Sequence, residues 1–155
     1  MGKIFDKKNY DRKSLVEVIQ QFGLDLKCCA QQIKRGFSDP DVWGMRTWFC
    51  RTVPAMLDKM SEKAHGTPEK IANLPRFSGN PEAAHREWVR ILKKTAFLLR
   101  ESDEETAERK IDNPFDLRTQ TENYLHFEKR KLAYREKCRK EGMTLFSYWF
   151  NDLWD

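Results

Sequence analysis

Few residues of this 155-residue chain have the type and spacing that chemistry requires. Glu82 and His85 form one E-x-x-H pair, the helical arrangement that supplies metal ligands in di-iron bundles. Such a site needs two such pairs and a glutamate from each of two further helices. The other E-x-x-H of the sequence, Glu62 and His65, falls at the C-terminal end of the second predicted helix rather than within a bundle. The other two histidines, His65 and His126, fall in different predicted elements. A solvated pair in a first helical turn is therefore favoured over a metal or cofactor site.

The four cysteines, Cys28, Cys29, Cys50 and Cys138, form no C-x-x-C pair. We expect reduced thiols, most of them small buried side chains. Cys138 beside a histidine would make a nucleophile pair, but a cysteine on an apolar stripe is more often part of a core. The motifs of nucleotide-binding loops, serine hydrolases and zinc proteases are absent from the sequence. The sequence thus predicts no catalytic residues and a protein that is not an enzyme.

The composition is typical of a folded protein, with 39% apolar and 34% charged residues. The apolar runs are too short to span a membrane, and the N-terminus lacks the apolar stretch of a secretory signal. We therefore expect a protein of the cytoplasm with no membrane partner. The formal charge of +5 is unevenly spread, since residues 124–141 hold seven Lys and Arg against three Glu.

The elements that must position any site are predicted to be helices. Ser14 and Glu17 form a capping box, helical spacing continues to Arg35, and Gly36 is expected to end the helix. A second helix is predicted over residues 38–64, with a kink at a proline inside it. The apolar stripe predicted for this second helix comprises Val42, Met45, Phe49, Val53, Met56, Met60 and Ala64. Pro54 interrupts the stripe without changing its phase.

Further along the chain, residues 67–80 are rich in Pro and Gly and are predicted to form a surface loop. A third helix follows with Trp88 on its buried face, and both Trp88 and Phe49 are predicted core residues. A capping box at Ser102 predicts a short acidic helix, and the last helix is predicted to start near residues 117–122.

No alternation typical of strands appears anywhere in the sequence. The sequence predicts an all-α fold, a helical bundle of four main helices plus one short helix between the last two. We expect a single domain over residues 1–155. Its first 13 residues are expected to form a flexible basic segment.

A candidate interaction surface comprises Asp41 and Trp43 with the C-terminal aromatic residues Phe150 and Trp154. Asp41 is well placed to stabilise a helix start. Trp43 lies off the apolar stripe, and no contact within the predicted helix accounts for a large apolar side chain there. The aromatic C-terminus has two interpretations, because it either completes the core or offers an anchor to a partner.

A candidate anion-binding face is formed by Lys129, Arg130, Lys137 and Lys140 on the last helix. Such a face would bind phosphates without sequence preference. Three glutamates are interleaved with it, and no helix-turn-helix or zinc pattern accompanies it. A solvated helix face is the favoured interpretation.

Four short stretches resemble a family known from other sequences. They are RGFSDPDVW at residues 35–43, HGTP at 65–68, WVRIL at 88–92 and FNDLWD at 150–155. In this order and over nearly the whole chain they resemble a group of short, uncharacterised proteins encoded by phages and prophages of bacteria. The resemblance implies a viral accessory protein in the bacterial cytoplasm and supplies no catalytic residues.

Small size and the absence of catalytic motifs favour a binding module for a host or antiviral-defence protein. The alternatives are binding of nucleic acid or a signalling nucleotide, and a minor virion or assembly component. The sequence predicts neither the identity of the partner nor the oligomeric state.

Overall fold

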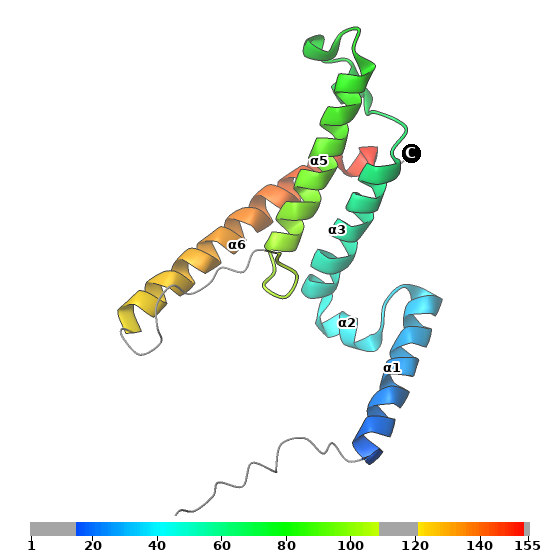
Figure 1. Ribbon diagram of the computed structural model, residues 1–155, viewed down its shortest axis with the longest axis vertical. Coiled ribbons are helices and arrows are strands. Elements are labelled where there is room, and N and C mark those ends of the chain that lie inside the picture. The colour runs from blue at the N-terminus through cyan, green and yellow to red at the C-terminus, as the bar shows by residue number, and fades with distance from the viewer. Residues whose placement is uncertain (1–14, 109–120, 154–155) are drawn as a thin grey trace, which may run out of the picture. The chain divides into compact units, whose positions relative to one another are not determined.

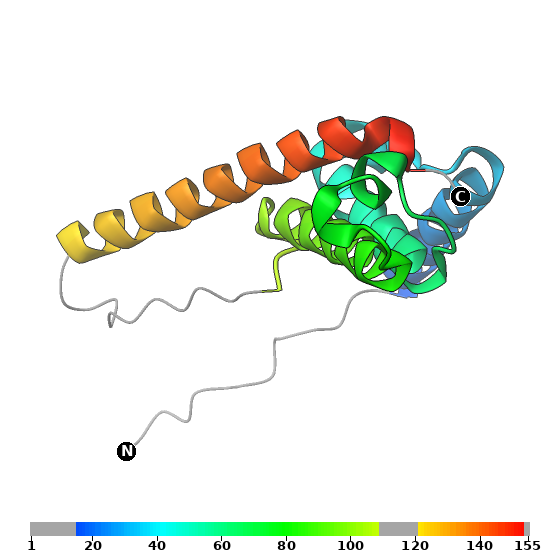
Figure 2. The same ribbon diagram turned by 90° about the horizontal axis from the view of Figure 1, so that it is seen from above.

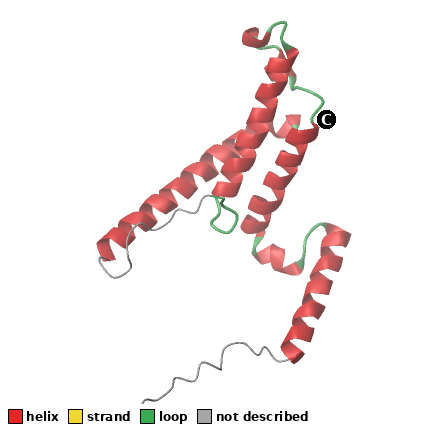
Figure 3. Ribbon diagram, in the orientation of Figure 1, coloured by secondary structure: helices red, strands yellow, loops and turns green. Residues whose placement is uncertain are grey.

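The computed structural model describes residues 15–108 and 121–153, with the side chains of residues 15–19 and 121–123 left undescribed. This part of the chain is 82% helical and contains no strand (Figure 3). It has six α-helices, of which four are seven residues or longer. The predicted all-α fold with four main helices is therefore confirmed. Residues 1–13 lie outside the described residues.

The chain divides into two compact units, an N-terminal unit, Met1–Gly44, and a C-terminal unit, Met45–Asp155, and each is described by itself. The expectation of a single domain over residues 1–155 stays a prediction. In the N-terminal unit, α1 (Leu15–Arg35) ends at Gly36, whose φ of 80° is the left-handed conformation predicted for this position. A short second helix, α2 (Asp39–Trp43), follows.

The prediction of one kinked helix over residues 38–64 is wrong, because the chain forms two helices there. α2 ends at Gly44, which closes the turn by donating its N–H to the carbonyl of Pro40, and α3 (Met45–Lys63) starts at the next residue. Glycine carries a conformational cost inside a helix, so an end at Gly44 is physically reasonable. α3 continues through Pro54, which is buried.

In the C-terminal unit, α5 (Pro81–Glu101) packs against both α3 and α6 (Thr121–Trp149), as Figure 1 shows. α6 runs past the end of α5 and projects from this unit (Figure 2). Three short elements complete the unit: α4 (Glu69–Ala72), η1 (Pro75–Phe77) and η2 (Phe150–Asp152).

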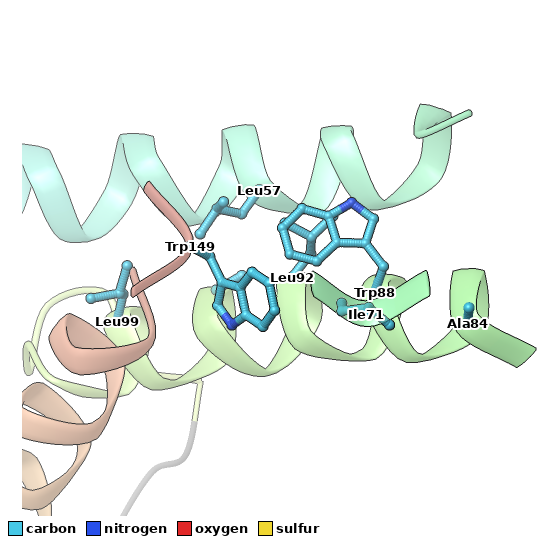
Figure 4. Close-up of a cluster of buried hydrophobic side chains, with 8 residues drawn as sticks. Leu57, Ile71, Ala84, Trp88, Leu92, Leu99 and Trp149 are labelled. Atoms are coloured by element: carbon cyan, nitrogen blue, oxygen red, sulfur yellow. The ribbon is translucent and has the colours of Figure 1, made fainter. Parts of the chain in front are cut away.

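The core of the C-terminal unit is built mainly on α5, the middle helix. Trp88 is 3% exposed, and its ring lies 5.3 Å from that of Trp149 on α6, at an angle of 59° (Figure 4). Trp88 is thus confirmed as a core residue. The cluster consists of Leu57, Ile71, Ala84, Trp88, Leu92, Ala96, Leu99 and Trp149. Phe49, the other predicted core residue, is half-buried and packs against this cluster.

α6 crosses α5 closely at Gly142. A Cβ atom at this position would lie 3.1 Å from the Leu98 Cβ and 3.2 Å from the Leu99 backbone nitrogen. These distances are tighter than ordinary van der Waals contact, so a side chain at this position would displace its neighbours on α5 by a few tenths of an ångström.

The predicted stripe of the second helix is partly wrong in phase. Val42, Met45 and Met56 are 48%, 65% and 66% exposed. The buried residues of α3 are Cys50, Pro54, Leu57 and Ser61. The buried face is thus centred about one position, or 100°, from the predicted stripe, and the remaining stripe residues lie at its edge.

Two predicted elements between the main helices also differ. The predicted surface loop contains α4, whose Ile71 is 1% exposed and belongs to the core. The predicted acidic helix does not start at Ser102, because residues 102–108 form turns. The Ser102 hydroxyl donates back to the Leu99 carbonyl at 2.6 Å and so ends α5, and Asp103 accepts from the Glu105 N–H at 3.0 Å. Residues 109–120 lie outside the described part.

Candidate interaction surface

α2 begins with a hydrogen-bonded cap that uses Asp41. The carboxylate of Asp41 accepts hydrogen bonds from the Ser38 backbone N–H at 2.8 Å and from the Ser38 hydroxyl at 2.6 Å. Ser38 is 3% exposed. These contacts match the stabilising role expected for a carboxylate in the first turn. Asp41 thus shapes the start of α2, and its place in the candidate interaction surface is indirect.

A second carboxylate, Asp39, ties α2 to the end of α1. Its carboxylate accepts hydrogen bonds from the Arg35 guanidinium and, at 2.6 Å, from the Gln31 side chain. Its backbone N–H donates to the Gln31 side-chain oxygen at 2.8 Å, and the Lys27 ammonium lies 3.6 Å from the carboxylate. The hydrogen bond from Arg35, followed by that from Gln31, lowers the pKa of Asp39 to about 2. Local side-chain contacts thus hold the short helix in one orientation on α1.

Trp43 is the last residue of this anchored helix, and its side chain is 93% exposed. Val42 beside it is 48% exposed. Phe37 is also exposed, and the Arg35 guanidinium covers one face of its ring at 4.7 Å from the centroid. The N-terminal unit therefore offers a large, solvent-exposed indole on a backbone that is fixed by short-range contacts.

The other half of the predicted surface lies in the C-terminal unit. Phe150 is 60% exposed and lies in η2, with its ring edge-on to Phe146 at 5.6 Å. Phe146 in turn contacts Phe49 at 5.7 Å. Trp149 is buried, so the aromatic C-terminus both completes the core and exposes Phe150. Trp154 lies outside the described residues. Trp43 and Phe150 belong to different units, so their grouping stays a prediction.

The candidate anion-binding face occupies the exposed side of α6. Lys129, Arg130, Lys137 and Lys140 are all exposed and fall within an arc of about 100° at 100° per residue. Acids offset two of them, since the ammonium groups of Lys137 and Lys140 lie 3.9 Å from Glu141 and 3.5 Å from Glu136. A bidentate contact from Arg139 lowers the pKa of Glu136 to about 2, so this carboxylate stays charged. The face is less positive than its basic residues alone suggest.

A buried charged cluster on α5 and α6 was not predicted. Glu101 is fully buried, and its carboxylate accepts hydrogen bonds from the Tyr134 hydroxyl at 3.0 Å and the Arg135 guanidinium at 2.9 Å. The same carboxylate accepts from the Glu108 N–H at 2.9 Å. Burial first, then hydrogen bonds to Cys138 and Glu101, raise the pKa of Tyr134 to about 12. The cluster fixes the position at which α6 passes the end of α5.

Asp103 makes a second buried anchor at the same end of α5. It accepts hydrogen bonds from Arg46 at 2.9 Å and from Thr47 at 3.1 Å, both on α3. Burial alone would raise the pKa of Asp103, but these bonds and one from the Glu105 N–H more than offset it and lower the pKa. The acidic residues near the predicted helix start at Ser102 thus include two carboxylates, Glu101 and Asp103, that are buried where the helices pack. The sequence signalled only the pairing of Glu101 with Arg135, through the excess of Lys and Arg in residues 124–141.

A cavity of about 440 Å³ opens in the C-terminal unit beside Trp88. Its polar wall includes Lys70 and Asp152, whose charged groups lie 2.7 Å apart and satisfy each other. The Glu82 and His85 pair does not converge on one point, since His85 Nδ1 lies 3.4 Å from the Thr67 hydroxyl and Glu82 pairs with Arg86 at 3.7 Å. Across the described ranges, no three His, Cys, Asp or Glu side chains gather as a metal site would require.

Comparison with protein-family models, with curated proteins and with solved structures finds no match to this chain. Within the described residues, no helix has the length and hydropathy of a membrane span.

Proposed function

We propose that this chain is a non-enzymatic binding module that uses Trp43 as its anchor on a host or antiviral-defence protein. The phage or prophage origin and the action in the bacterial cytoplasm belong to the same proposal. Its support is the contrast between an indole that is 93% exposed and the short helix that holds it in place through Ser38, Asp39 and Asp41.

An exposed tryptophan on a fixed backbone has the properties of an interface anchor. Tryptophan is enriched among the few residues that carry most of the binding energy of a protein interface. A rigid backbone lowers the conformational entropy lost on binding, because the anchor is already presented in its bound position. The hydrogen bonds of Asp39 and Asp41 supply that rigidity in α2.

Site-specific photo-crosslinking in bacterial cells tests this proposal. A crosslinking amino acid replaces Val42 in one variant, because Val42 adjoins Trp43 and is 48% exposed, so that the indole itself is kept. It replaces Arg86, whose side chain is 69% exposed in the other unit, in a control, and Lys137 on α6 in a third variant. We expect one protein to be captured in stoichiometric amount from position 42 and not from position 86. Equal capture at positions 42 and 86, or capture of nucleic acid from position 137 alone, contradicts the proposal.

Once the captured protein is purified, its affinity gives a second measurement. Trp43→Ala should raise Kd at least about 30-fold, since interface anchors contribute about 2 kcal/mol or more. Met56→Ala is the matched control, because Met56 is a large apolar side chain that is 66% exposed in the C-terminal unit. A Kd unchanged by Trp43→Ala would mean that another surface binds the partner.

A further inference from the structure

Six of the apolar residues of α1 follow a regular spacing that no contact described above explains. Successive members are separated by four, three, four, three and four residues. They are Leu15, Ile19, Phe22, Leu26, Cys29 and Ile33. This is the 3.5-residue repeat of a left-handed coiled coil, in which one apolar seam faces a partner helix along its whole length.

The part of this seam whose side chains are described, from Phe22 to Ile33, is exposed within the N-terminal unit. Phe22 is 64%, Leu26 55% and Ile33 89% exposed. α1 has 21 residues, so the seam extends over about 30 Å at 1.5 Å per residue. An apolar stripe of this length on a solvent-exposed helix is a docking surface for another helix.

The described helices of the C-terminal unit do not offer a matching seam. The exposed apolar residues of α3 and α6 do not alternate at spacings of three and four residues. They are Met45 and Met56 on α3, and Tyr124, Leu125, Leu132, Met143 and Tyr148 on α6. The buried apolar residues of α5 are already used in the core. Among the described helices, the partner with the same repeat and length is α1 itself.

We propose that α1 pairs with α1 of a second copy of this chain in a parallel, in-register, two-stranded coiled coil. In the seam, Ile19, Leu26 and Ile33 take the a positions and Leu15, Phe22 and Cys29 the d positions. β-Branched residues at a together with leucine at d favour two parallel strands. Ile19 and Ile33 meet this preference at a, and Leu15 meets it at d.

The flanking charges favour the parallel orientation. Asp25 is the one charged residue at the e and g positions, which are otherwise Val16, Val18, Gly23, Ala30 and Gln32. In a parallel pair, Asp25 lies opposite Ala30 of the second copy. In an antiparallel pair, it would lie opposite the Asp25 of the second copy, and two like charges would meet beside an apolar seam. This proposal does not depend on the function proposed for Trp43, and neither of its tests needs a partner protein.

Sedimentation of the full chain at several concentrations tests the pairing. We expect a particle of twice the 18.5 kDa chain mass, with dissociation on dilution. Leu26→Glu, which places a charge in the seam, should give the single-chain mass. Leu24→Glu is the matched control, because Leu24 is 56% exposed against 55% for Leu26 but lies on the opposite side of α1. A native chain of single mass at every concentration overturns the proposal, as does an equal effect of the two variants.

The adjacent cysteines of α1 test the orientation. Cys29 lies in the seam and Cys28 outside it, whereas Cys50 and Cys138 are buried. Diamide accepts the two electrons and two protons that two thiols release when they form a disulfide. We expect Cys28→Ser to form a disulfide-linked dimer through Cys29, and Cys29→Ser to form much less. Equal yields, or a dimer through Cys28 alone, overturn the parallel register, since an antiparallel seam places Cys29 opposite Ile19.

Discussion

α1 and α5 are two helices of 21 residues each, both with a strong apolar stripe, yet they differ in what covers that stripe. In α5, Trp88, Leu92 and Leu99 are at most 3% exposed, because α3, α4 and α6 supply side chains on several sides. In α1, the described stripe residues Phe22, Leu26 and Ile33 are 64%, 55% and 89% exposed within their unit. Equal amphipathicity thus predicts that a helix buries one face. It does not predict whether that face packs on the same chain or on another molecule.

The largest expected contrast between the two helices is in truncation of an aromatic side chain. Trp88→Ala should lower the free energy of unfolding of the C-terminal unit by about 3–5 kcal/mol, because it removes a buried indole and leaves a cavity. Phe22→Ala should change the same free energy by less than about 0.5 kcal/mol, because Phe22 belongs to the other unit.

Chemical denaturation, followed by the near-ultraviolet circular dichroism of the core tryptophans, measures both variants. A loss of stability from Phe22→Ala as large as that from Trp88→Ala would mean that α1 belongs to the same core, and the comparison would fail.

Glycine replacement should give effects of opposite sign in the two regions. Gly142→Ala should destabilise the C-terminal unit by about 1–3 kcal/mol, because the added Cβ meets Leu98 and Leu99 at a close helix crossing. Gly23→Ala in α1 should raise the helix stability by up to about 1 kcal/mol, because a Cβ there meets nothing within 4 Å and alanine is the better helix former.

Amide hydrogen exchange of α1 and denaturation of the C-terminal unit measure the two changes separately. Destabilisation by Gly23→Ala would place a tightly packed partner against that side of α1 and would redefine the seam.

The smallest expected effect is the pH dependence of the contact between α1 and α2. The pKa of Asp39 in the folded chain, about 2, is below its ordinary value of 3.8. The ionised carboxylate therefore favours the folded arrangement above pH 3.8, and this contribution is lost as the pH falls through 3.8 to about 2. Because Asp39 is exposed, the effect should be confined to the end of α1 and to α2.

Carbon chemical shifts of the Asp39 carboxyl group, recorded against pH, measure this titration. Arg35→Gln should move the apparent pKa back toward 3.8, since the Arg35 hydrogen bond is the main cause of the shift. An unshifted pKa in the native chain would mean that α2 is not held on α1 in solution.

Two patterns that depend on near neighbours in the sequence predicted the structure correctly. The spacing of apolar residues predicted the buried face of α5, and a glycine after two basic residues predicted the end of α1. Both features depend on contacts within about one helical turn, which the sequence states directly. The all-α fold follows from the same local information.

Several features that the sequence did not predict depend on contacts between distant segments. Ile71 enters the core only because α4 lies beside α5, and Glu101 is buried only because Tyr134 and Arg135 reach it from α6. Gly44 could have been read as a helix end, but an apolar stripe that continued past it favoured one helix. Trp43 was set apart by an apolar stripe that is wrong in phase, so its exposure could not be predicted from the sequence.

The tilted pair of Trp88 and Trp149 gives this fold an optical signature. Two indoles with ring centroids 5.3 Å apart at an angle of 59° are close enough for their electronic transitions to couple. Coupled transitions produce a pair of circular dichroism bands of opposite sign, which isolated tryptophans lack. Because one ring belongs to α5 and the other to α6, the band pair disappears when these helices separate, even if both stay helical. The band pair therefore reports helix docking in the unlabelled chain.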